Sequence, residues 1–87
     1  VGLNTLNPIE GVSVYPTITS SELNIQFNQS YDKVQIDVID LTGRVVTRTN
    51  ADGLTNTVVD VNTLMSGSYV VRINADGRNG VYRFVKK

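Results

Sequence analysis

Few residues of this chain have side chains suited to catalysis. The sequence contains neither His nor Cys, which removes the side chain that titrates near neutral pH and every thiolate nucleophile. Asp37 and Asp40 are an odd number of positions apart in one predicted strand, so regular pleating directs them to opposite faces and no glycosidase-like carboxylate pair forms. A catalytic Ser–Lys pair would need a buried lysine, whereas Lys33, Lys86 and Lys87 lie at predicted strand ends and are expected to be solvated. We therefore expect no enzyme.

Two similar segments carry oxygen ligands that a metal ion could use. Residues 48–53 and 72–77 share the pattern Arg-x-Asn-Ala-Asp-Gly. The pattern resembles the start of a calcium loop, but such a loop needs further oxygen ligands and a closing Glu. No Glu follows Glu22. Each copy is typical of a strand that ends in an Asp-Gly turn, which favours hairpin connections. We predict two turns, and no metal or other cofactor.

The elements that would position these residues are short strands. In the clearest segment Val34, Ile36 and Val38 alternate with polar residues before a turn at residues 40–43, and a return strand follows. This pattern predicts a β-hairpin. No segment shows the 3.6-residue apolar period of a helix. The spacing predicts an all-β fold, a seven-stranded immunoglobulin-like antiparallel β-sandwich. The predicted strands comprise residues 12–15, 23–27, 33–40, 44–49, 56–61, 68–75 and 81–87.

Three further expectations concern parts of this sandwich. The first strand stops at Pro16, which favours an edge position, and a polar turn follows at residues 17–21. Leu64 and Met65 are expected to close one end of the core. Tyr69 is expected to pack in the core with its hydroxyl at the rim.

Charge is unevenly distributed although the formal net charge is zero. Residues 1–43 hold one basic and five acidic residues, whereas residues 44–87 hold seven basic and three acidic residues. The end of the chain is basic, with Arg78, Arg83, Lys86 and Lys87. Four cations without an aromatic platform do not indicate nucleic-acid binding. Two interpretations stay open: a solvated strand that discourages edge pairing, or a recognition tail.

The chain divides into a linker and one domain. Residues 1–11 are rich in Gly and Asn and are predicted to be a linker to a preceding cargo domain, while residues 12–87 form the domain. The chain starts without Met or an apolar leader, so we interpret it as a fragment of a longer protein. No apolar run approaches the roughly 20 residues of a membrane-spanning helix, so no membrane span is expected.

Three blocks in a fixed order resemble the C-terminal sorting domain of proteins exported by the bacterial type IX (Por) secretion system. The resemblance runs from about residue 12 to residue 87, nearly the whole chain. Thr17-Ile18 and Ser20-Ser21 depart from the family pattern after Pro16 and leave the shape of the first turn open. The first block is Val14-Tyr15-Pro16 with the strand at residues 23–25. The second is residues 34–46, which include Asp40, Gly43 and Arg44. The third is residues 64–73, which include Gly67 and Tyr69, and the chain then ends with Val85-Lys86-Lys87.

This resemblance implies a function in secretion. It implies a parent protein of the Bacteroidota type, taken to the periplasm and then across the outer membrane, and so secreted or displayed at the cell surface. The implied partners are the type IX translocon, a sortase-like protease and the upstream cargo. Protease cleavage would fall in the region of Gly2, Asn7 and Gly11.

The resemblance and the charge pattern together suggest roles for individual residues. An exposed final strand could accept an added strand from the translocon. The expected recognition residues are Arg83, Val85, Lys86 and Lys87. The motif residues Pro16, Asp40, Gly43, Arg44, Gly67 and Tyr69 are interpreted as scaffold.

Two other classes of function stay open at this point. One is an accessory module that binds carbohydrate or a protein partner beside a catalytic domain, which ligand-binding aromatics on an exposed face would favour. The other is a stalk or adhesin domain, which an array of similar domains would favour. Open strand edges would also allow two copies to pair as a dimer.

Overall fold

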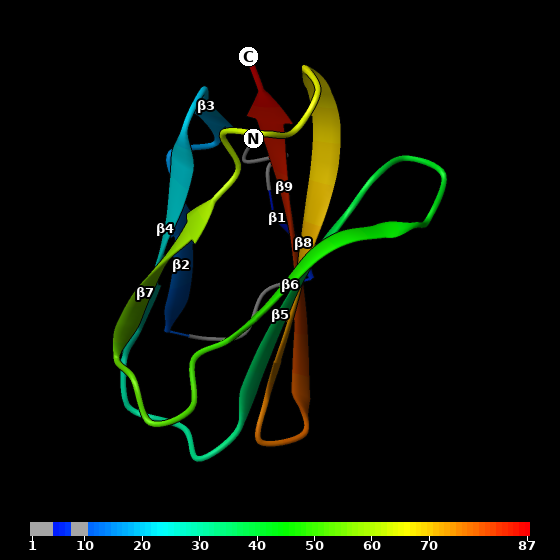
Figure 1. Cartoon of the computed structure of the whole chain (residues 1–87). Coiled ribbons are helices and arrows are strands. Elements are labelled where there is room, and N and C mark those ends of the chain that lie inside the picture. The colour runs from blue at the N-terminus through cyan, green and yellow to red at the C-terminus, as the bar shows by residue number, and fades with distance from the viewer. Residues whose placement is uncertain (1–4, 8–10) are drawn as a thin grey trace.

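Two stacked β-sheets form the protein, as Figure 1 shows. The structure is a computed structural model that describes residues 5–7 and 11–87, and these residues contain nine strands. The larger sheet has six strands in the order β1-β9-β8-β5-β6, with β3 also paired to β9, and the smaller sheet has the order β2-β4-β7. The strands are β1 (Thr5–Asn7), β2 (Val12–Tyr15), β3 (Ile18–Thr19), β4 (Glu22–Phe27), β5 (Val34–Ile39), β6 (Val45–Asn50), β7 (Asn56–Asp60), β8 (Gly67–Ala75) and β9 (Arg78–Lys86).

The core lies between the two sheets and follows the alternation in the sequence. Leu23 and Ile25 of β4 face Ile36 of β5 and Ile73 of β8, and all four side chains are fully buried. Burial of a side chain of this size contributes about 1.5–3 kcal/mol relative to exposure. The predicted immunoglobulin-like sandwich is confirmed, and the seven predicted strands correspond to β2 and β4 to β9.

The predicted hairpin between β5 and β6 is also confirmed. Asp40 and Arg44 close the turn with a backbone hydrogen bond of 2.9 Å, and Gly43 N–H donates to the Asp40 carbonyl at 3.0 Å. The Asp40 carboxylate accepts from the Thr42 hydroxyl at 2.6 Å and from the Thr42 and Arg44 N–H groups. The Thr42 hydroxyl and these N–H groups hold the pKa of Asp40 below its ordinary value. Gly43 completes the turn with φ of 91°.

We expect Gly43→Val to destabilise the protein. A β-branched residue at this φ is strained, with a cost on the order of 1–3 kcal/mol, and no neighbouring atom within 4 Å would clash with the new Cβ. Thermal unfolding followed by circular dichroism should show a lower melting temperature for Gly43→Val than for wild type. Leu41→Val in the same turn is the control, because Leu41 is largely exposed. A wild-type melting temperature for Gly43→Val would contradict the assigned turn.

The two Asp-Gly turns differ. Asp76 and Gly77 have φ of 51° and 86° and join β8 directly to β9 as a hairpin, as predicted. The hairpin expected at Asp52-Gly53 is wrong, because β6 and β7 belong to different sheets. There the Asp52 carboxylate accepts from Val34 N–H at 2.7 Å, which holds the chain at the start of β5 before it crosses to the other sheet.

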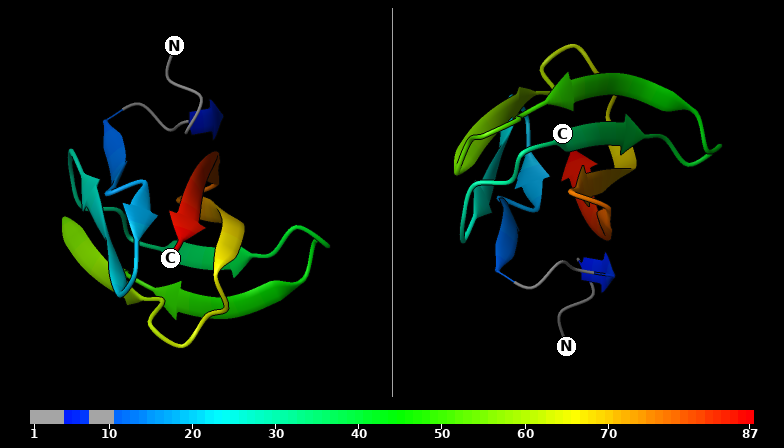
Figure 2. Two further views of the ribbon diagram at one scale, coloured as in Figure 1. Left: turned by 90° about the horizontal axis from the view of Figure 1, so that it is seen from above. Right: turned by 90° about the horizontal axis from the view of Figure 1, so that it is seen from below.

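Two short strands that the sequence did not predict cover the outer edge of β9. β1 lies antiparallel to it, with Thr5 opposite Tyr82, and β3 lies parallel to it, with Ile18 opposite Val85. Figure 2 shows β1 beside β9 at the edge of the larger sheet. The expectation of an exposed final strand is therefore wrong. A strand of two or three residues is too short to give a period-2 signal, so the sequence could not indicate this pairing.

The edge strands are β2 and β7 in the smaller sheet and β6 and the short β1 and β3 in the larger one. The edge position predicted for the first strand, which is β2, is confirmed. Within residues 5–7 and 11–87, no helix is long and apolar enough to span a membrane.

Candidate functional site

Residues from two of the three motif blocks meet in one surface hollow of about 510 Å³. It lies between the β5–β6 hairpin and the connection from β7 to β8. Asp40 and Arg44 form an ion pair of 3.2 Å at its rim, but the Arg44 side chain is largely exposed, so the pair adds little stability. The hollow is lined by Asp40, Arg44, Val45, Val46, Thr63, Leu64, Met65 and Tyr69.

Tyr69 fixes the connection that forms one wall of this hollow. Its ring stacks on Phe84 of β9, with centroids 5.5 Å apart. Its hydroxyl donates to the Met65 carbonyl at 2.6 Å, which confirms the expected hydroxyl position at the core rim. The arrangement resembles the tyrosine corner of β-sandwiches. Leu64 packs against the core, but Met65 is exposed, so the expectation that Met65 closes the core is wrong.

We expect Tyr69→Phe to lower the free energy of unfolding by about 1–2 kcal/mol, because the partly buried hydrogen bond to Met65 is lost while the ring packing is kept. Urea denaturation measures this change. Tyr15→Phe is the matched control: its hydroxyl reaches Gln26 only at 3.4 Å on an exposed face, so its effect should stay within about 0.5 kcal/mol. Equal effects would contradict a role of the Tyr69 hydroxyl in holding the connection.

The four expected recognition residues do not share one face. Arg83 and Val85 point outward from β9, whereas Lys86 is only 7% exposed and its ammonium donates to the Lys87 carbonyl at 2.9 Å. The expectation of a solvated Lys86 is wrong. Lys86 continues the inward alternation of Tyr82 and Phe84. This alternation was the sequence signal that could have predicted a buried position for Lys86. Lys87 N–H donates to the Thr19 carbonyl.

A buried carboxylate on the outer face of the larger sheet was missed by sequence reasoning. Asp37 is 2% exposed and accepts hydrogen bonds from Arg48 Nε at 2.8 Å and from Arg72 at 3.0 Å. Arg48 on β6 and Arg72 on β8 lie directly opposite Asp37 on β5. The arginine side chains cover the carboxylate, which explains how a polar position of the alternating pattern becomes buried.

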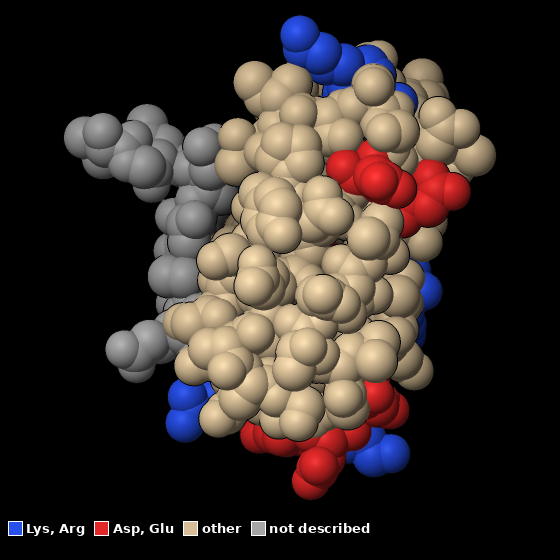
Figure 3. Space-filling view, turned by 90° about the vertical axis from the view of Figure 1, so that its left-hand side faces the viewer, with Lys and Arg blue, Asp and Glu red and all other residues tan. Residues whose placement is uncertain are grey.

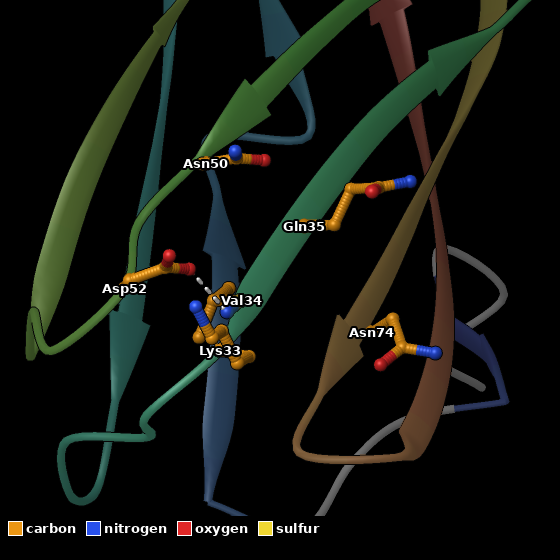
Figure 4. A pocket seen from close by; sticks show the side chains of 6 residues that line it. All are labelled: Lys33, Val34, Gln35, Asn50, Asp52 and Asn74. Carbon is orange, nitrogen blue, oxygen red and sulfur yellow. Dashed lines mark hydrogen bonds between the residues drawn. The ribbon is translucent and has the colours of Figure 1, made fainter.

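The repeated Arg-x-Asn-Ala-Asp-Gly pattern was the signal for this arrangement. Its two copies flank β5 on either side, so that Asn50 and Asn74 both lie opposite Gln35. The Asp76 carboxylate accepts from Lys33 N–H at 2.9 Å, as Asp52 does from Val34 N–H. Figure 4 shows Gln35, Asn50, Asp52 and Asn74 around a hollow at the start of β5. The repeat therefore anchors a strand.

Burial acts to raise the pKa of Asp37, but hydrogen bonds from Arg48 and Arg72 outweigh it and hold that pKa below its ordinary value. A lowered folded-state pKa gives stability that is present above the unfolded-state pKa and lost as the pH falls through the folded-state value. The contribution of Asp37 to stability should therefore be complete at neutral pH and should decline below about pH 4.

We expect Asp37→Asn to cost about 1–2 kcal/mol at neutral pH, a value that allows for the half-exposed arginines. The difference from wild type should shrink at about pH 3, as urea denaturation at both pH values would show. Asp60→Asn removes an exposed carboxylate whose partner is the Asn62 N–H and serves as the control. A difference that does not change with pH would contradict the ion-pair account.

The remaining predicted residues have local structural settings. Tyr15-Pro16 is a cis peptide bond, and Gly67 opens β8 opposite Lys86. Gly11 has φ of 80°, and a Cβ there would clash with the Asn28 side chain. Of the expected cleavage region, Asn7 belongs to β1, whereas Gly2 lies outside the described residues. The described part of the chain contains no group of three or more metal-ligating side chains.

Comparison with known families identifies the chain. The profile of the secretion system C-terminal sorting domain family matches residues 13–87. The chain belongs to this family. The domain is thus a C-terminal sorting signal of type IX secretion. The domains of this family are non-catalytic. Membership implies an upstream cargo, the type IX machinery as partner, and a destination at the cell surface or outside the cell.

A solved structure shares the fold. A DUF3244 family protein with an immunoglobulin-like β-sandwich from Bacteroides vulgatus superposes with a TM-score of 0.77 at 14% identity, over 88% of this chain and 85% of that one. At this identity the similarity concerns the fold alone. No curated protein sequence matches the chain.

Proposed function

We propose that this domain directs an upstream cargo across the outer membrane through the type IX translocon. The family match over residues 13–87 carries this proposal. Recognition uses outward side chains at the end of β9, with Arg83 and Val85 as the contact residues on its exposed face. Lys86 contributes by holding the end of the strand in place, and Lys87 by its bond to Thr19. Recognition by addition of a strand to β9 is not part of the proposal, because β1 and β3 already occupy that edge.

A sortase-like protease then cuts before the sandwich, within the region of Gly2, Asn7 and Gly11, and the cargo is released or attached to the cell surface. The pairing of β1 with β9 gives this cut a structural consequence. A cut between β1 and β2 would leave β1 covalently attached to the cargo. Thr5 and Asn7 would then still be paired with Tyr82 and Val81 of β9. Cleavage would therefore detach the cargo only after this short ladder has opened.

The test is export of a reporter. Residues 1–87 would be fused behind a periplasmic reporter in a bacterium with type IX secretion, and the reporter would be measured at the cell surface, in the medium and in the periplasm. We expect the reporter outside the cell, and only in the periplasm when the translocon is disabled. A folded fusion retained in the periplasm of the intact strain would contradict the proposed function and would favour a binding module.

A further inference from the structure

The outer face of the larger sheet is divided into a polar half and an apolar half. Residues directly opposite one another on neighbouring strands share a face of the sheet, so the strand registers give its rows. One row consists of Asn50, Gln35, Asn74 and Asn79, and the next of Arg48, Asp37, Arg72 and Val81. The following row contains Val45, Ile39, Val70 and Arg83, where an irregularity in the β5–β6 register after Val38 brings Val45 opposite Ile39. The last row contains Ser68, Val85 and Ile18.

The last two rows, apart from the polar Ser68 between them, form what we call the apolar band: Ile18, Val85, Val70, Ile39, Val45 and Arg83. The band crosses β3, β9, β8, β5 and β6. Ile18 is 53% exposed, Val45 37% and Val85 36%, while Val70 and Ile39 are half-buried. Single exposed hydrophobic residues are ordinary, but a contiguous apolar patch rimmed by polar residues is typical of an interaction surface.

Arg83 places a positive charge within the band, which a partner that covers the band has to compensate. Arg44, Arg48 and Arg72 each contact a carboxylate, whereas no carboxylate of residues 5–7 and 11–87 forms an ion pair with Arg83. Arg83 lies directly opposite Val70 on the neighbouring strand, within the apolar rows. A protein partner that covered these rows would bury the guanidinium and would have to supply an acidic side chain to compensate it.

We propose that the apolar band is the surface on which a protein of the secretion machinery docks, with apolar contacts across five strands and a carboxylate of the partner opposite Arg83. This inference rests on the proposed function and extends the contact from the end of β9 to β3, β8, β5 and β6. A second copy of the chain fits less well. The band itself contains no acidic residue, so a symmetric dimer through it would bring the Arg83 side chains together.

The smaller sheet supplies the control surface. Figure 3 shows its outer face, where Lys, Arg, Asp and Glu side chains gather at the two ends and the middle is uncharged. Val58 on β7 is 50% exposed on this face, opposite Asn24. Its exposure is comparable to that of Val45 and Ile18, but it lies on the other side of the sandwich from the band.

The experiment compares matched variants in the reporter fusion. Val45→Gln and Ile18→Gln change the two ends of the band, and Val58→Gln makes the same change on the other sheet. Arg83→Glu reverses the central charge, Arg83→Lys keeps it, and Arg78→Glu reverses an exposed arginine at the start of β9. Each purified 1–87 variant is first checked for a wild-type melting temperature. Val45 and Ile18 lie at opposite ends of the band, so the band can still be tested at one of them if the variant at the other fails to fold.

We expect Val45→Gln, Ile18→Gln and Arg83→Glu each to slow export by about tenfold or more, because each removes contacts worth at least 1.4 kcal/mol. Val58→Gln and Arg78→Glu should be exported at close to the wild-type rate, and Arg83→Lys, which keeps the charge, should be exported faster than Arg83→Glu. Val45 on β6 lies four strands away from β3 in the band and does not belong to the end of β9. Because Val45 also lines the hollow beside the β5–β6 hairpin, export of Ile18→Gln has to fall with that of Val45→Gln for the band to stand.

The contrary outcomes are distinct. If the unmodified fusion stays in the periplasm, the proposed function fails, and this inference with it. If the unmodified fusion is exported and Val45→Gln is exported as well as Val58→Gln, the proposed function stands and the band is overturned. A dimer in sedimentation experiments that dissociates on Val45→Gln substitution would make a second copy the occupant, and would also overturn the proposal.

Discussion

The last strand is held on both of its edges, and the rest of the structure depends on this constraint. β9 pairs with β8 along its whole length on one side and with β1 and β3 on the other. Its inward residues reach across the core: Phe84 stacks on Tyr69, and the buried Tyr82 hydroxyl donates to the Val12 carbonyl of the opposite sheet at 3.2 Å. A terminal strand is thereby turned into an interior element that joins both layers.

This constraint limits how a partner protein can recognise a sorting signal at the end of the chain. β8 pairs with the whole of one edge of β9, β1 and β3 pair with residues 81–82 and 85–86 on the other, and the inward side chains of β9 belong to the core. Its outward side chains, those of Asn79, Val81, Arg83 and Val85, lie on the outer face of the sheet beside those of the neighbouring strands. Recognition would then depend on a surface assembled from segments far apart in the sequence. Such a surface exists only when the sandwich is folded.

Much of the fold could be predicted from the sequence, because period-2 alternation is strong in β4, β5 and β8. The β5–β6 hairpin followed from the turn chemistry of residues 40–43, and the position of the Tyr69 hydroxyl from the amphipathic nature of tyrosine. β1 and β3 could not be predicted, because two or three residues give no periodicity and their pairing is set by contacts distant in sequence. The polar position of Asp37 suggested solvent exposure, since its burial depends on the register of three strands. Gly43 was correctly assigned to the turn at residues 40–43, where it has a positive φ.

The hairpin expected at Asp52 illustrates the limit of local signals. Asp-Gly sequences at residues 52–53 and 76–77 are identical, yet only the second joins adjacent strands. The difference lies in where the next strand packs: β9 pairs with β8, whereas β7 completes the smaller sheet beside β4. Local turn chemistry fixes the backbone at the turn but leaves open the sheet to which the chain proceeds.

The most direct test of this account is whether the sorting signal is a folded surface. Val71→Asp places a carboxylate at a fully buried position of β8 and should unfold the sandwich while leaving every residue of β9 unchanged. The fusion carrying this variant, confirmed as unfolded by circular dichroism and as intact in the periplasm by immunoblotting, should not be exported. Export at the wild-type rate would contradict the account and would show that the end of the chain is read as a linear peptide.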